Sequence, residues 1–88
     1  MAIDVIEVEP GDEAWRVDLK IYEGVYKKDR YSVRVVDIPR SPVDWTLDQQ
    51  KNAVMGYVRH EVTQHMRRGS LPPTGMQLDG ERVWERET

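Results

Sequence analysis

Two histidines, His60 and His65, are the first residues whose type and spacing could do chemistry. A zinc-binding helix places its histidines four residues apart, so that both imidazoles share one face and reach a single ion. Here the histidines are five residues apart, so they lie about 140° from each other around a helix. The spacing therefore predicts no metal site. We expect His65 at the edge of the apolar core and His60 in solvent or against a partner.

Other catalytic patterns are also incomplete. Gly75 and Gly80 have the glycine spacing of a phosphate-binding loop, but Glu81 and Arg82 follow where a lysine and a hydroxyl residue are needed. The chain has no cysteine, and its serines show no suggestive spacing to a histidine. Carboxylate pairs are frequent, but none is flanked by the apolar residues that raise a carboxyl pKa. We expect a non-enzymatic protein without a cofactor.

The segment Pro39-Arg40-Ser41-Pro42 matches the loose Pro-x-x-Pro pattern that polyproline-binding domains recognise. The same residues also describe the start of a helix, with a serine cap followed by proline at the first position. Since capping chemistry explains every residue of the segment, the sequence favours a rigid connection between a strand and a helix.

Tyrosines and basic residues alternate around residues 22–34, a pattern that can stack on bases and neutralise phosphates. However, residues 1–23 hold seven acids and the net charge is −3, which opposes phosphate binding. Nucleic-acid binding is therefore the alternative function, with the candidate residues Tyr26, Lys27, Lys28, Arg30 and Arg34.

Two further groups of residues could contact another protein. One is the outward side of the strand near residues 31–38, whose apolar residues need a cover because one helix shields only one face of a sheet. That cover is either a C-terminal hairpin carrying Trp84 or another chain. The other group is a spot of small residues on the far side of the helix. Together the candidate partner-binding residues are Tyr22, Arg34, Val36, Ile38, Ala53, Gly56 and His60.

The elements that must position these residues begin with three strands. Residues 3–8 are rich in β-branched residues, and the alternation over residues 15–21 predicts a second strand with one buried face. Residues 31–38 are predicted to form a third strand, in which Tyr31, Val33 and Val35 match the inward face. We place the tip of the second hairpin at Lys28-Asp29, with Gly24 as a bulge. A tighter turn at Glu23-Gly24 is the alternative. The inward residues are Trp15, Val17, Leu19, Ile21, Tyr31, Val33 and Val35.

A long helix follows, because Thr46 and Gln49 form a capping box and Gly69 suits the left-handed end of a helix. Its predicted range is about residues 47–68. At 100° per residue an apolar stripe runs along one side, interrupted by Lys51. The stripe consists of Leu47, Val54, Met55, Val58, Val62 and Met66.

The C-terminal part reads as a proline-rich loop at 71–75 and a short hairpin around Asp79-Gly80. The order is therefore β-β-β-α-β(-β). We expect a single α+β domain over residues 1–88, an antiparallel sheet packed on one face by a single helix.

Composition fits a small folded domain, with 39% hydrophobic and 33% charged residues and a mean hydropathy of −0.71. No apolar stretch approaches 18 residues and the N-terminus is acidic, so we expect a cytoplasmic protein. The predicted function is a protein–protein interaction module, an adaptor or inhibitor whose partner is another protein or a second copy in a homodimer. A weaker alternative is a subunit of a phage or secretion-type assembly.

Overall fold

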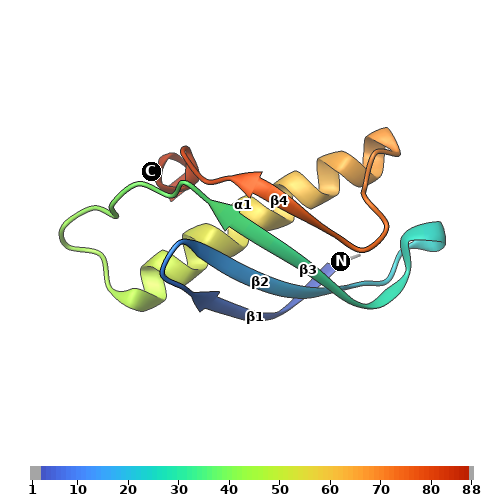
Figure 1. Cartoon of the computed structure of the whole chain (residues 1–88), viewed down its shortest axis with the longest axis horizontal. Coiled ribbons are helices and arrows are strands. Elements are labelled where there is room, and N and C mark those ends of the chain that lie inside the picture. The colour runs from blue at the N-terminus through green and yellow to red at the C-terminus, as the bar shows by residue number, and fades with distance from the viewer. Residues whose placement is uncertain (1–2, 88) are drawn as a thin grey trace.

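The computed structural model describes residues 3–87, and the side chains of residues 3–85. Three strands come first, β1 (Ile3–Pro10), β2 (Ala14–Ile21) and β3 (Lys28–Val36). A long helix, α1 (Leu47–Arg68), then crosses one face of the sheet, and β4 (Gly75–Asp79) completes it (Figure 1). The α+β class and the single long helix over residues 47–68 are confirmed.

The sheet is mixed, in the order β1-β2-β3-β4. The first three strands are antiparallel, as predicted, but β4 runs parallel to β3, from the pair Ser32–Gly75 to the pair Val36–Asp79. The reason is that α1 carries the chain back along the sheet, so the next strand starts beside the beginning of β3. The expected hairpin around Asp79-Gly80 does not form. Among the described residues the chain continues from β4 into a 3-10 turn, η2 (Val83–Glu87), which packs on α1.

The turn between β2 and β3 lies earlier than predicted. Ile21 pairs with Lys28, so the connection spans residues 22–27 and contains a 3-10 turn, η1 (Gly24–Tyr26). Lys28 and Asp29 belong to β3, and the placement of the hairpin tip there was wrong. Gly24 has a φ of 46°, a backbone conformation that favours glycine. The turn therefore begins at Gly24, close to the alternative turn predicted at Glu23-Gly24.

The core lies between α1 and the face of the sheet that it covers. Every predicted inward residue of β2 and β3 except the half-buried Trp15 is fully buried there. On the helix, Val54, Val58 and Val62 are fully buried, whereas Leu47 is 51% exposed. Leu47 departs from the predicted stripe because the first turn of α1 extends past the ends of the strands (Figure 1).

Both ends of α1 are capped as predicted. The Thr46 hydroxyl accepts a hydrogen bond from the Gln49 amide at 3.2 Å, and the Gln49 side chain accepts one from the Thr46 amide at 2.7 Å. At the other end Gly69 adopts the left-handed conformation, with a φ of 69°. The Ser70 amide then donates to the carbonyl of His65 at 2.9 Å. These bonds fix the length of α1 independently of the sheet.

Candidate protein-binding surfaces

The apolar residues predicted on the outer side of β3 do not form a continuous strip. Val36 and Ile38 are both half-buried, and Ile38 packs against the core. Gly80 packs at this end of β3: its amide donates to the backbone carbonyl of Val36 at 2.7 Å, and a side chain added at Gly80 would collide with the side chains of Ile38 and of the inward-facing Val35. Tyr22 lies at the opposite end of the sheet, since Ala14 and not Tyr22 is close to Val36. These residues therefore do not form one exposed patch.

On the helix, the structure separates the three residues expected on its far side. Ala53 is only 1% exposed and belongs to the core, which corrects its assignment to a partner surface. Ala53 is buried because η2 packs along this flank of α1 and widens the covered arc, with Val83 fully buried. Gly56 and His60 are exposed, and a side chain added at Gly56 would have nothing within 4 Å.

The two histidines lie in different surroundings. His60 lines a polar hollow with Tyr57, Glu61, Arg82 and Glu85, whereas His65 is half-buried, with its Nδ1 2.9 Å from the Ser70 hydroxyl. Among residues with described side chains, no group of three or more histidine and acidic residues is arranged to hold a metal ion.

The tyrosines and bases of the β2–β3 region point to different parts of the molecule. Tyr31 is fully buried, and its hydroxyl donates to the carbonyl of Pro72 at 3.0 Å. Lys28 donates to the carbonyl of Pro73 and sits 5.9 Å from the centre of the Tyr31 ring. Tyr26 is half-buried at the end of α1, while Lys27, Arg30 and Arg34 are exposed. The structure thus brings together no stacking platform from these residues.

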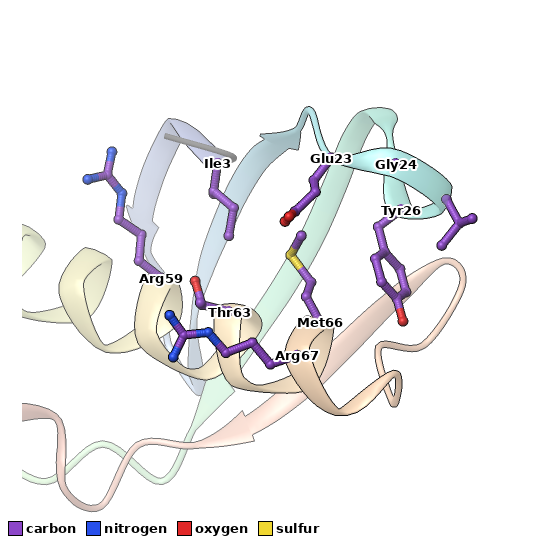
Figure 2. A pocket seen from close by; sticks show the side chains of 9 residues that line it. Ile3, Glu23, Gly24, Tyr26, Arg59, Thr63, Met66 and Arg67 are labelled. Carbon is purple, nitrogen blue, oxygen red and sulfur yellow. The ribbon is translucent and has the colours of Figure 1, made fainter.

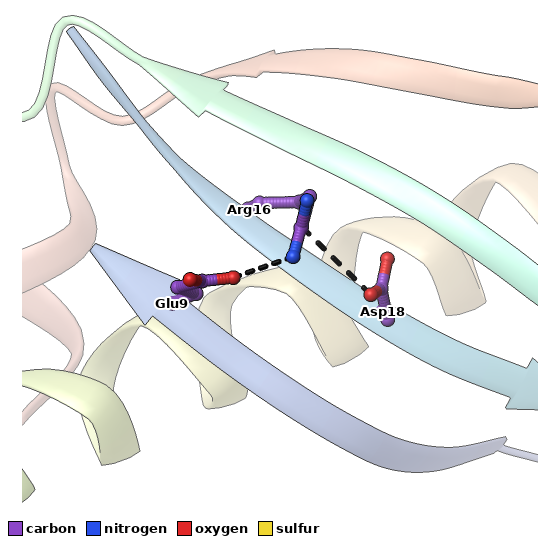
Figure 3. A network of polar contacts seen from close by, with 3 residues as sticks. All are labelled: Glu9, Arg16 and Asp18. Atoms are coloured by element: carbon purple, nitrogen blue, oxygen red, sulfur yellow. Dashed lines mark hydrogen bonds and ion pairs between the residues drawn. The ribbon is translucent and has the colours of Figure 1, made fainter. Parts of the chain in front are cut away.

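The uncovered face of the sheet carries charges that are largely paired within the chain. Arg16 binds Glu9, and its Nε lies 3.8 Å from a carboxylate oxygen of Asp18, which is only 6% exposed (Figure 3). Near the other end of the sheet, the Tyr22 hydroxyl donates to Asp4 at 3.1 Å, and this bond raises the pKa of the phenol. An antiparallel sheet with such a face can remain in water without a partner.

The three tryptophans of the chain gather at one end of the molecule, which we call the tryptophan end. Trp15 is the second residue of β2, Trp45 precedes α1 and Trp84 lies in η2. The rings of Trp45 and Trp84 meet edge to face, with centroids 5.4 Å apart and planes inclined by 77°. Trp15 and Trp84 line a hollow of about 640 Å³ whose other walls come mainly from the connection between β3 and α1. Those walls are Ile38, Pro39, Arg40, Ser41, Pro42, Val43 and Gln50.

Val43 stands out on the rim of this hollow because its side chain is 99% exposed. The sequence alone predicted no binding role for Val43 or for the tryptophans. No local pattern marks them, because the three tryptophans come from segments far apart in the chain and meet only when η2 folds back on α1. The one available sequence signal was the residue type, since tryptophan is enriched where proteins bind one another.

Comparison of the chain with protein-family models, with curated proteins and with solved structures found no match. No described helix is sufficiently long and apolar to cross a membrane.

Proposed function

We propose that this protein is a non-enzymatic protein-binding module that holds an apolar, extended peptide segment of its partner at the tryptophan end. The observation that supports this function best is the gathering of all three tryptophans beside a hollow of about 640 Å³. Tryptophan dominates binding energy at protein interfaces because it buries a large rigid surface with little loss of conformational entropy.

The tryptophan end is held in shape before any partner arrives. Trp84 donates from its indole Nε1 to the carbonyl of Pro39 at 2.7 Å, and Trp45 packs edge to face against the same indole. Pro39 and Pro42 further restrict the backbone of the opposite wall. A preformed site loses less entropy on binding, so a short segment can reach useful affinity there.

The size of this end favours a peptide segment over a large protein face. The molecule measures 41 × 22 × 21 Å between Cα positions, and the tryptophan end lies at one end of the longest axis (Figure 1). Such a cross-section is smaller than the roughly 800 Å² per partner that a standard stable interface buries. An apolar anchor side chain inserted between the tryptophans, with extended chain on either side, fits this area.

The experiment is a selection from a random peptide library against the whole chain, followed by titration of selected peptides. Since all three tryptophans lie at the proposed site, binding is expected to change the intrinsic tryptophan fluorescence. Val43→Asp is expected to weaken binding at least tenfold, because it replaces an exposed apolar side chain on the rim with a charge that the apolar peptide segment would have to cover. Ile6→Asp is the matched control, since Ile6 is an apolar side chain of β1 that is 50% exposed and lines neither end pocket.

Peptides that bind the Val43→Asp protein as tightly as the unchanged one, without a fluorescence change, would overturn the proposal. Sedimentation equilibrium of both variants adds a second readout. A dimer that is lost in Val43→Asp and retained in Ile6→Asp would show that the tryptophan end receives a second copy of the chain, and would overturn the peptide partner.

A further inference from the structure

A second pocket lies at the opposite end of the molecule, and it differs from the tryptophan end in chemistry. It has a volume of about 480 Å³ and lies between the last turns of α1, the β2–β3 turn and the start of β1 (Figure 2). No tryptophan lines it. What this pocket binds is therefore a question separate from the proposed function.

The interior of the pocket is apolar. Ile3 and Met66 are 4% and 9% exposed and present aliphatic and thioether surface, and Tyr26 closes one side with its ring. The Tyr26 wall is fixed in place, because η1 is held by bonds from the Tyr26 amide to Glu23 at 2.9 Å and from the Lys27 amide to Gly24 at 3.1 Å. An aliphatic chain of a ligand would replace water on this surface.

The rim on the helix side is made of hydrogen-bond donors. Arg59, Thr63 and Arg67 are spaced by four residues, which places them along one side of α1. Neither arginine forms an ion pair with a described residue. The Nε atom of Arg59 is buried and has no hydrogen-bond partner among the described residues. A buried donor in this condition destabilises the protein unless a further group meets it.

We propose that this pocket binds a small carboxylate carried on an aliphatic chain. The carboxylate would accept hydrogen bonds from Arg67 and the Thr63 hydroxyl, and the chain would lie on Ile3 and Met66. Arg59, whose guanidinium points away from that of Arg67 (Figure 2), would complete the site by turning toward the carboxylate. Arginine suits this role because its planar guanidinium can meet both oxygens of a carboxylate. The same chemistry is offered by a free fatty acid of medium length and by the C-terminal residue of an apolar peptide.

Two neighbouring charged residues predict in which direction substitutions should change the affinity for the ligand. Glu23 lines the pocket from the β2–β3 turn and repels a bound anion. Arg68 adjoins Arg67 in the last turn of α1 but does not line the pocket. If Arg67 serves only to complement the negative end of the helix dipole, the two arginines should behave alike. If it holds a carboxylate, only Arg67 should affect ligand affinity.

The experiment titrates the whole chain with hexanoate, octanoate and decanoate, following backbone amide NMR shifts of residues 22–27 and 59–67. Affinity should rise by about three- to fourfold per added CH₂ until the pocket is filled. Octanol and octylammonium should bind at least tenfold more weakly than octanoate. N-acetyl-leucyl-leucine, with a free carboxylate, distinguishes a peptide terminus from a fatty acid as the source.

Variants test the rim. Arg59→Gln and Arg67→Gln should each weaken octanoate binding about tenfold or more, whereas Arg68→Gln should leave it unchanged. Glu23→Gln should strengthen it by about two- to fivefold. The proposal is overturned if neither octanoate nor N-acetyl-leucyl-leucine shifts the named amides, if Arg68→Gln weakens binding as much as Arg67→Gln, or if Glu23→Gln weakens it. Val43→Asp should have no effect, so the outcome is independent of the tryptophan end.

Discussion

The indole Nε1 of Trp84 donates a 2.7 Å hydrogen bond to the carbonyl oxygen of Pro39, 45 residues earlier in the chain. This bond ties the C-terminal 3-10 turn to the connection between β3 and α1. Together with the edge-to-face packing of Trp45 on Trp84, it makes the tryptophan end a feature built from three separate segments. The stability of the tryptophan end therefore depends on contacts between residues that are far apart in the sequence.

Trp84→Phe tests this bond directly. Phenylalanine keeps an aromatic ring but cannot donate to Pro39, so we expect the free energy of unfolding to fall by about 0.5–1.5 kcal/mol, as measured by urea denaturation. A variant as stable as the unchanged protein would show that the bond contributes nothing to the fold.

Replacing two of the glycines with alanine should change the stability of the protein in opposite directions. At Gly80 an added Cβ would lie 2.9 Å from Cγ1 of Val35 and closer still to Cγ1 of Ile38, so Gly80→Ala should destabilise by about 1–3 kcal/mol. At Gly56, in the middle of α1, nothing lies within 4 Å, so Gly56→Ala should stabilise by up to about 1 kcal/mol. Thermal unfolding of the two variants checks both signs, and equal shifts would contradict the packing of Gly80 on β3.

The orientation of α1 is tested by a pair of aspartate substitutions. Val58 is fully buried, so Val58→Asp should destabilise by several kcal/mol, enough to unfold a domain of this size. His60 is exposed, and His60→Asp should leave the melting temperature nearly unchanged. Circular dichroism during heating measures both. Equal tolerance of the two changes would mean that α1 is rotated relative to the sheet.

The stability of the protein at alkaline pH should depend on Tyr31, the buried tyrosine of β3. Burial raises the pKa of the Tyr31 phenol above its ordinary value of about 10, so the folded state holds this proton at a pH where the unfolded state releases it. The contribution of this raised pKa to the free energy of unfolding is complete below pH 10 and is lost as the pH rises through the folded-state pKa.

The matching variant is Tyr31→Phe, which removes the titrating group and the 3.0 Å hydrogen bond to Pro72. We expect a loss of about 1 kcal/mol at neutral pH and a shallower fall of stability above pH 10, both measured by urea denaturation over a pH series. The same alkaline slope in both proteins would assign the effect to other groups.

The alternative function, nucleic-acid binding, can be tested by the affinity for nucleic acid and by its dependence on salt concentration. The bases Lys27, Arg30 and Arg34 are exposed, but Tyr31 is fully buried, Tyr26 is half-buried, and the chain carries a net charge of −3. We expect binding to a duplex or to single-stranded RNA no tighter than about 10⁻⁴–10⁻⁶ M at physiological salt. A tighter complex that weakens steeply with added salt, measured by fluorescence anisotropy, would favour the alternative function.

Local chemistry was sufficient to predict most secondary structure. The alternation in β2 and β3, the capping box at Thr46 and the glycine at position 69 each depend on residues a few positions apart. Such patterns fix strand faces and helix ends through short-range sterics and hydrogen bonds. The β2–β3 turn was misplaced because Gly24 and Lys28-Asp29 both carry turn signals, and only the pairing of Ile21 with Lys28 distinguishes them.

What only the tertiary structure decided depends on contacts between distant segments. The parallel pairing of β4 with β3, the burial of Ala53 under η2, and the gathering of Trp15, Trp45 and Trp84 all arise when the C-terminal segment folds back on α1. By itself, the sequence determined an α+β chain with an amphipathic helix over residues 47–68. It could not determine the two end pockets, because their walls come from separate segments that meet only through the long-range packing of the hydrophobic core.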